Sequence, residues 1–249
     1  MKTLRHFGLL IGAVLFTLAP SLRAQDNPAS ASGMIIRLMS WDGAVTDLWV
    51  ADGGSYVAAQ AGEFVLGRAL SLKHQTSSLR LYKDQTVDGV VCKQPVANVA
   101  LPSGTASALV VLAPAPEGSP LPYQGRALDQ SLEAHPLNTM RVVNFSNLKL
   151  ALRVGGATAV VVPSGEEGFP FPSDGPFSIT VEVAVGTTDG WTMVQRSLQP
   201  APPGRRILVI VRDGRPDYSI QDPALRTKPV DVIYLIDRAP PASVAIAQK

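Results

Sequence analysis

Two histidines and one cysteine are the side chains of this chain best suited to metal binding or nucleophilic catalysis. Beyond residue 30 these are His74, His135 and Cys92. Both kinds of chemistry normally need such groups clustered with carboxylates, and neither histidine has another histidine or the cysteine in its own loop. We therefore expect both histidines in solvated loops, with no metal and no cofactor. We predict Cys92 to be a small buried thiol without a disulfide partner.

Serine and carboxylate chemistry gains no support from the spacing. The chain lacks G-x-S-x-G, and Pro163-Ser164-Gly165 has the composition of a β-turn. Glu166 and Glu167 follow in a Gly/Pro-rich stretch that we expect to be a loop, where adjacent side chains face different ways. The sequence therefore predicts a protein that is not an enzyme. A hydrolase stays open as a less favoured alternative, recognisable by a histidine, a carboxylate and a hydroxyl in one pocket.

Aromatic side chains offer a route to binding. Three tryptophans and five tyrosines could form a platform for a sugar ring, although aromatic residues in strands more often pack across neighbouring strands. Trp41 and Trp191 each adjoin an Asp-Gly dipeptide or a turn, where a ring can face outwards. These two are the candidate ligand-binding residues, and they predict a protein or glycan partner.

Charge is nearly balanced, with 22 basic and 20 acidic residues and a formal net charge of +2. This balance implies neither nucleic acid nor an anionic membrane surface as a partner. One stretch is locally basic, but its arginines alternate with acidic residues, so we expect a solvated strand face. The arginines of this stretch are Arg196, Arg205, Arg206, Arg212 and Arg215.

The elements that would position these side chains are β-strands. Leu148, Leu150, Leu152 and Val154 alternate with other residues at the period of a strand with one buried face. Repeated Asp-Gly dipeptides suit tight turns between antiparallel strands. In a first unit we expect strands at Met34–Trp41, Asp47–Ala51, Ser55–Ala59, Ser78–Tyr82, Val96–Leu101, Ala108–Leu112 and Gly125–Asp129.

A second unit repeats this order of strands. We expect Met140–Phe145, Leu148–Val154, Thr158–Val162, Phe177–Val185, Trp191–Leu198, Arg206–Val211 and Asp231–Asp237. Matched positions, such as Arg37 with Arg141 and Leu109 with Leu208, keep an offset of roughly 100 residues. The prediction is an all-β chain of two tandem antiparallel Ig-like β-sandwiches from an internal duplication, although regular strand spacing alone could produce the match.

This organisation gives domain bounds and two separate cores. We expect sandwiches at 34–131 and 139–238, a linker at 132–138 and a disordered tail at 239–249. The first core should hold Leu38, Leu48, Val50, Leu79, Leu81, Val110 and Leu112. The second should hold Val142, Leu150, Leu152, Ile179, Val181, Leu208 and Ile210.

The N-terminus has the order of a secretory signal peptide. Lys2 and Arg5 precede the apolar run 7–19, and small residues lead to Ala24. We expect cleavage after Ala24, a flexible lead-in at 25–33 and no integral membrane span in the mature protein, because the apolar run is too short. The protein is then secreted or periplasmic.

Two paired segments carry a family resemblance. These are Ile35-Ile36-Arg37-Leu38-Met39-Ser40 and Met140-Arg141-Val142-Val143-Asn144-Phe145-Ser146, the second continued by Leu152-Arg153-Val154-Gly155-Gly156. The chain resembles secreted bacterial proteins with tandem β domains of unknown function, whose repeats begin with an R-V-V-x-x-S strand. That resemblance implies export and a sandwich fold, and it implies no catalytic residue.

A second resemblance concerns mechanism. Two Ig-like domains behind a signal peptide also describe periplasmic pilus chaperones, which use basic residues in the cleft between domains and add an edge strand to a client. We therefore predict a non-catalytic interaction or structural protein of the cell envelope or exterior. A chaperone-like strand-donating protein is the alternative, and a carbohydrate-binding module or hydrolase is less favoured.

Overall fold

All the regular secondary structure in the described residues is β-strand. The computed structural model describes residues 33–172, 177–216, 219, 221–222 and 227–238, which belong to one compact unit. Among these residues no helix is long and apolar enough to cross a membrane. The expected signal peptide (1–24), the lead-in (25–33) apart from Gly33, and the tail (239–249) lie outside the described residues. The all-β prediction is confirmed.

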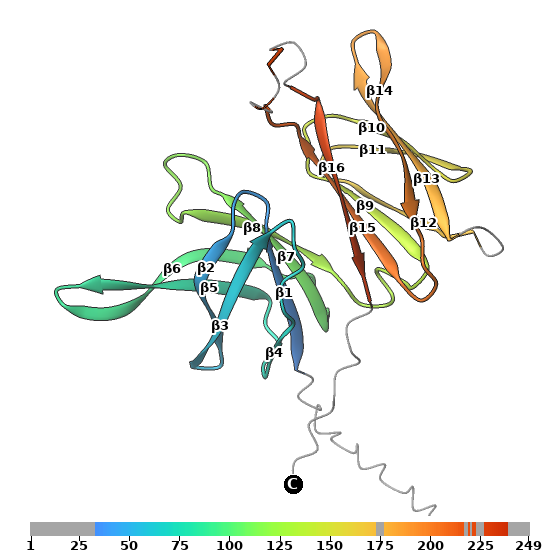
Figure 1. The fold of residues 1–249 in the computed structure, drawn as a ribbon. Coiled ribbons are helices and arrows are strands. Elements are labelled where there is room, and N and C mark those ends of the chain that lie inside the picture. The colour runs from blue at the N-terminus through green and yellow to red at the C-terminus, as the bar shows by residue number, and fades with distance from the viewer. Residues whose placement is uncertain (1–32, 173–176, 217–218, 220, 223–226, 239–249) are drawn as a thin grey trace, which may run out of the picture. The chain divides into compact units, whose positions relative to one another are not determined.

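The described residues form sixteen strands, which follow one another along the chain (Figure 1). The first half contains β1 (Met34–Ser40), β2 (Val45–Asp52), β3 (Ser55–Glu63), β4 (Leu70–Leu72), β5 (Ser78–Val87), β6 (Val90–Ala100), β7 (Ser107–Pro114) and β8 (Tyr123–Asp129). The second half contains β9 (Thr139–Asn144), β10 (Leu150–Val154), β11 (Ala157–Val161), β12 (Glu166–Pro170), β13 (Ser178–Thr187), β14 (Gly190–Pro200), β15 (Arg206–Asp213) and β16 (Val230–Asp237).

In the first half, strand β3 connects two parts of one sheet. Its early residues pair antiparallel with β2, and its last residues pair parallel with β1, where Met39 is opposite Gly62. The strand order is β6-β5-β2-β3-β1-β7-β8, and β4 pairs with the first residues of β1. Side chains from both parts enclose one apolar core that contains every residue expected there, from Leu38 to Leu112.

The second half consists of two four-stranded sheets, ordered β11-β10-β13-β14 and β12-β9-β15-β16. Alternate residues of β10 and β13 point between the sheets and are buried, as the sequence alternation predicts. Together with Ile207, Val209 and Val211 of β15 they form the second core.

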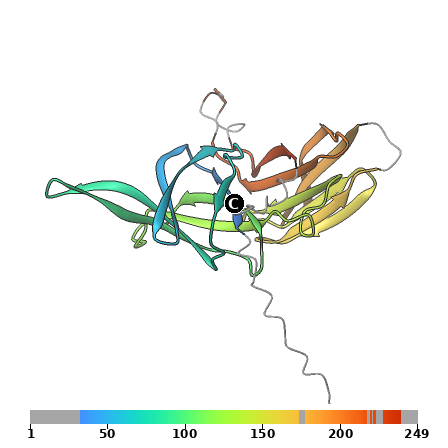
Figure 2. The same cartoon turned by 90° about the horizontal axis from the view of Figure 1, so that it is seen from below.

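Strand pairing in the second half follows that of the first. β1 and β9 pair parallel with β7 and β15, which pair antiparallel with β8 and β16. β2 and β10 each lie between two antiparallel neighbours, β3 and β5 in one case and β11 and β13 in the other. Long hairpins β5–β6 and β13–β14 complete each pattern, and the first extends well beyond its sheet (Figure 2).

A third apolar cluster joins β1, β7 and β8 to β9, β15 and β16, and we call it the joint cluster. Its buried residues are Met39, Leu109, Val111, Leu128, Val143, Leu208, Ile210 and Leu235. The placement of Leu208 and Ile210 in the second core is therefore wrong. β15 is buried on both faces, so alternate residues serve two different clusters, and a continuous apolar run does not say which residue serves which.

Each expected strand overlaps an observed one, but the sequence analysis missed β4 and β12. β4 has only three residues. β12 reads Glu-Glu-Gly-Phe-Pro, which shows no alternation, and it is held by pairing with β9 and by the buried Phe169. The expectation that Glu166 and Glu167 lie in a loop is therefore wrong.

Candidate functional site

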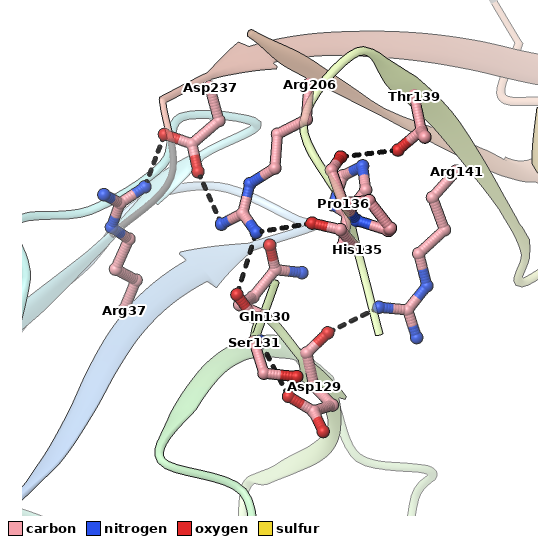
Figure 3. Close-up of polar contacts among 10 residues, drawn as sticks. All are labelled: Arg37, Asp129, Gln130, Ser131, His135, Pro136, Thr139, Arg141, Arg206 and Asp237. Atoms are coloured by element: carbon pink, nitrogen blue, oxygen red, sulfur yellow. Dashed lines mark hydrogen bonds and ion pairs between the residues drawn. The ribbon is translucent and has the colours of Figure 1, made fainter. Parts of the chain in front are cut away.

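A buried arginine, Arg206, lies at the centre of the polar contacts between the two halves (Figure 3). Only 1% of Arg206 is exposed. Its Nη1 donates to the carbonyl oxygens of Gln130 (2.8 Å) and His135 (3.1 Å), and its Nη2 donates to Asp237 Oδ2 (3.1 Å). The other oxygen of Asp237 accepts from Arg37 Nη1 at 2.7 Å. We call these five residues the joint network; in it one carboxylate of β16 ties β1 to β15.

Arg141 of β9 adds a second contact beside the joint network. Its Nη1 donates to the carbonyl oxygen of Asp129, and its Nη2 donates to Glu166 Oε1 at 2.7 Å. Arg126 lies 3.7 Å from the other oxygen of Glu166. The carboxylate of Glu166 therefore has two arginine partners and connects β8, β9 and β12.

His135 is buried in the segment that joins β8 to β9, so its expected place in a solvated loop is wrong. Burial, and then the positive charges of Arg206 and Arg141, lower the pKa of His135 to about 4, and the charge of Asp237 opposes this shift. Burial also lowers the pKa of Arg206, against the opposing effect of Asp237. His135 is therefore neutral at pH 7.

The joint network has little free space. A cavity of about 10 Å³ beside it is lined by the apolar residues Leu66, Ala108 and Leu109 and by Arg37, Ser107, Gln130, Arg206 and Asp237. That volume is close to the room needed for one water molecule. The network therefore has the geometry of a structural joint and not of a substrate site.

Trp41, one of the two candidate ligand-binding residues, lies at another edge of the joint. Its carbonyl oxygen accepts from Arg212 Nη1 and Arg215 Nη2, both at 2.8 Å, and its ring meets Phe145 edge to face at 5.2 Å. Arg212 also pairs with Asp231 at 3.0 Å. Ligand binding by Trp41 stays a prediction, and its observed contacts are those of a packing residue.

The solvated face expected for the basic stretch is wrong for two of its members. Arg206 and Arg212 are buried, and each donates to a backbone carbonyl oxygen and to a carboxylate of the neighbouring strand β16. Arg196 is exposed, as expected. Alternation with acidic residues fits both cases, since the acids are here the ion-pair partners.

His74 and Asp52 form a local contact between two turns of the first half. The buried carboxylate of Asp52 accepts from the backbone N–H groups of Lys73 and His74, and it lies 3.1 Å from His74 Nδ1. Burial alone would raise the pKa of Asp52, but these hydrogen bonds together lower it. The contact fixes the loop after β4 against the β2–β3 turn.

A shallow hollow of about 460 Å³ lies on the sheet β11-β10-β13-β14. Its lining is mostly apolar and comprises Ala151, Leu152, Arg153, Thr158, Ala159, Val160, Glu182, Ala184 and Met193. The outward-facing residues at the centre of the sheet, Ala151 and Ala184, are small and lie opposite each other. Larger side chains stand on the edge strands, so the surface is concave.

Three charged side chains mark one part of the hollow. Glu182 of β13 lies 3.2 Å from Arg196 Nε and 3.7 Å from Arg153 Nη1. The Glu182 side chain is 16% exposed, whereas those of Arg153 and Arg196 are 61% and 73% exposed. The group carries a net positive charge, and its arginines retain donors that face water.

Trp191, the second candidate ligand-binding residue, stands beside the hollow. It lies opposite Gly186 in the β13–β14 pairing, and a Cβ added to Gly186 would come within 3.5 Å of the Trp191 ring. Trp191 is 52% exposed and Met193 is 55% exposed. The structure thus places Trp191 at an accessible apolar surface, well separated in the fold from the joint contacts of Trp41.

The corresponding face of the first half is filled. Trp49 lies opposite Tyr82, Tyr82 meets Tyr56 edge to face at 5.2 Å, and Lys93 Nζ lies 3.4 Å from the centre of a Trp49 ring. The Trp49 Nε1–H donates to Asp84, which also pairs with Lys93. Aromatic rings and a lysine therefore occupy the place where the other sheet is hollow.

The strand register shows which residues of the two faces correspond to each other. The pair Trp49–Tyr82 corresponds to Ala151–Ala184, since each connects the second strand of its half to the hairpin strand. A β-bulge lies directly before the second member of each pair, between Leu81 and Tyr82 and between Val183 and Ala184. Two positions further, Asp84 pairs with Lys93 and Gly186 pairs with Trp191, so Trp191 takes the position of Lys93.

Cys92 is exposed, so its expected burial is wrong. It lies in the part of β6 that pairs with the end of β5, where both strands are exposed. Among the described residues no group of three or more His, Cys, Asp or Glu side chains could hold a metal ion.

In comparisons with known proteins, no family model and no curated protein sequence matches this chain.

Of the residues at the hollow, sequence reasoning found only Trp191. Ala151, Ala184 and Glu182 were missed because small and charged residues at outward strand positions are common. A signal was available in the alignment of the two halves, where Ala151 and Ala184 align with Trp49 and Tyr82.

Proposed function

We propose that the protein is a non-catalytic, exported interaction or structural protein of the bacterial cell envelope or exterior. It binds a partner on the outer face of the sheet β11-β10-β13-β14. The observation that carries this proposal is the hollow at Ala151 and Ala184, on a face whose exposed side chains include Trp191 and Met193. Exposed apolar surface gathered in one place, with charged groups at its border, is typical of interaction sites.

The test is capture of partners from the envelope of the source cells by the full immobilised chain. Ala151→Trp fills the hollow and should abolish capture of the specific partner. Ala58→Trp is the matched control, because Ala58 is an exposed alanine on the outer face of the other sheet. Capture that is equal with both variants would contradict the proposed site. A panel of hydrolase substrates should show no turnover, and turnover abolished by a single substitution would overthrow the non-catalytic function.

The hydrolase alternative needs a histidine, a carboxylate and a hydroxyl directed at one pocket. His74 is turned to Asp52 in a contact between turns, and His135 is buried beside Arg206 and Arg141. Neither histidine lines the hollow. These placements favour the binding function over hydrolysis.

The chaperone alternative needs accessible basic residues between the halves, beside an unpaired strand. Arg206 is buried, and it donates to Gln130, His135 and Asp237. Arg37 shares the same carboxylate. Both arginines already have partners within the chain, so this geometry does not favour the alternative. Stoichiometric co-purification with one client that joins an edge strand would restore it.

We also propose that the two halves are tandem Ig-like sandwiches, at 34–131 and 139–238, from an internal duplication. Equivalent strand pairing and the equivalent bulges before Tyr82 and Ala184 support this origin. An experimental structure in which the bulges fall at non-equivalent positions would contradict it.

Export is the remaining part of the proposal. Its support is the order of charged, apolar and small residues that ends at Ala24. Mass spectrometry of cell fractions should find a mature N-terminus at Gln25 outside the cytoplasm. An intact Met1 on protein that only detergent extracts would contradict cleavage.

A further inference from the structure

We propose that the hollow binds an aromatic side chain of a partner protein that has a carboxylate next to that side chain. This inference rests on the proposed function, and it specifies the chemistry of the partner. Its basis is a comparison of the two outer sheet faces. In the first half, aromatic side chains of the chain itself fill the place that is hollow in the second half.

The first half shows what fits at this place in the fold. At the positions of Ala151 and Ala184 it has Trp49 and Tyr82, two rings side by side on the central strands. The Trp49 ring is covered by Lys93, whose Nζ lies 3.4 Å from the ring centre. In the second half both rings are replaced by methyl groups, and the backbone pairing and the bulge are retained. The space left is therefore suited to an aromatic ring.

Trp191 supplies the covering group for such a ring. It has the register position of Lys93, on the strand next to the one that carries Ala184. An aromatic ring seated at Ala151 and Ala184 would have Val160 beside it on β11 and Met193 beside it on β14, with Trp191 two positions along β14 from Met193. Offset or edge-to-face contacts between aromatic rings add to the stabilisation from apolar burial.

Charge complementarity defines the neighbour of the ring. Arg153 and Arg196 share the single carboxylate of Glu182 and keep most of their side-chain surface in water. Guanidinium groups with free donors bind carboxylates through paired hydrogen bonds. An acidic residue next to the aromatic side chain would therefore be favoured, and a basic one would be repelled.

The lining favours a protein segment over a glycan. Apart from Arg153, Glu182 and Thr158, the residues that line the hollow are aliphatic or methionine. A sugar presents hydroxyl groups around its ring, and each hydroxyl buried without a hydrogen-bond partner is costly. An aromatic side chain leaves no such group against Ala151, Val160 and Ala184.

The test uses the full chain with three blocked peptides, observed by NMR at the backbone amides of Ala151 and Ala184. The probe is acetyl-Asp-Trp-Asp-amide. One comparison peptide replaces both aspartates with lysine, and the other replaces tryptophan with leucine. We expect saturable shifts with the probe and about tenfold weaker binding of each comparison peptide.

Two variants separate the contributions of the ring and of the charge. Ala151→Trp with Ala184→Tyr reproduces the filled face of the first half and should abolish binding of the probe. Arg153→Ala with Arg196→Ala leaves the hollow open and should remove the preference for aspartate over lysine. Arg80→Ala is the matched control, an exposed arginine on the outer face of the first half, and it should change neither property.

Every outcome decides the proposal. Equal binding of the tryptophan and leucine peptides, or no shift at Ala151 and Ala184 with any peptide, would overturn it. Shifts at these amides produced by an acidic oligosaccharide and by no peptide would overturn it in favour of a glycan ligand. If partner capture is lost with Ala151→Trp while all three peptides fail to bind, the proposed function stands and this inference fails. If Ala151→Trp leaves partner capture unchanged, the proposed function fails, and this inference, which rests on it, fails with it.

Discussion

The outer sheet faces of the two halves have the same order of antiparallel strands, β6-β5-β2-β3 and β14-β13-β10-β11, and different surfaces. In the first, Trp49, Tyr82 and Lys93 form a layer over the central strands. In the second, Ala151 and Ala184 leave the hollow at the same register. The inward-facing residues of these strands are buried and apolar in both halves. The comparison shows that one outer face is filled and the other is open over the same order of strands, with an apolar core beneath each.

The largest expected effect comes from breaking the joint that holds both halves in one arrangement. Arg206→Ala leaves Asp237 with one partner fewer and leaves two buried carbonyl oxygens without a donor. We expect a loss of about 3–5 kcal/mol in the free energy of unfolding, measured with urea. Arg205→Ala, at the half-buried neighbouring position, should change it by about 0.5 kcal/mol or less. A loss below about 1 kcal/mol for Arg206→Ala would contradict the role of the joint network.

Acid should weaken the same joint without a substitution. The pKa of His135 is lowered to about 4 in the folded chain, so the unfolded chain binds this proton more readily. The free energy of unfolding therefore has its full contribution from His135 above the ordinary pKa of about 6.5. It declines by about 3 kcal/mol as the pH falls towards 4.

Denaturant titrations at a series of pH values measure this decline. His135→Leu should flatten it between pH 6.5 and 4, whereas His74→Gln should retain it. Asp52, whose pKa is lowered by hydrogen bonds against the effect of burial, contributes only at pH values below this window. An unchanged slope in His135→Leu would show that another group is responsible.

A smaller effect should follow when the filled face is emptied. Trp49→Ala combined with Tyr82→Ala gives the first half the alanine pair of the second. Loss of the ring contacts should cost about 2 kcal/mol, since both rings are only partly buried. Leu198→Ala is the comparison in the second half, where Leu198 is 67% exposed, and it should lower the free energy of unfolding by about 0.5 kcal/mol or less. Equal costs for the two changes would break the contrast between the faces.

The smallest effect concerns the contact between Lys93 and Trp49. Lys93→Met keeps most of the aliphatic chain and removes the charge above the ring. A double-mutant cycle with Trp49→Ala should give a coupling energy of about 0.5–1 kcal/mol. A parallel cycle between Lys93 and Asp84 measures the ion pair separately. No coupling with Trp49 would mean that the lysine is held only by Asp84.

The strands could be predicted because their apolar residues alternate, as Leu150, Leu152 and Val154 show. The assignment of Leu208 and Ile210 could not, because residues 207–211 of β15 are all apolar and all buried. β12 was missed because it forms by pairing with β9, a strand distant in the sequence, and its own residues show no strand pattern.

The candidate site was harder to predict than the fold. An outward-facing tryptophan beside a turn signals accessibility, and Trp191 was found in this way. The hollow arises from what Ala151 and Ala184 lack, and a missing side chain is visible only against the equivalent Trp49 and Tyr82. The burial of Arg206 depends on Gln130, His135 and Asp237, which come together only in the folded chain.

The parallel pairing of β1 with β7 has a consequence for the kinetics of folding. Arg37 of β1 lies opposite Leu109 of β7, and Met140 of β9 lies opposite Ile207 of β15. Each half therefore closes its sheet only when residues far apart in the chain meet, and the loop entropy must be overcome before those contacts form. During synthesis β1 has no parallel neighbour on this side until β7 has left the ribosome. We expect each half to fold in milliseconds to seconds, as chains with many non-local contacts do.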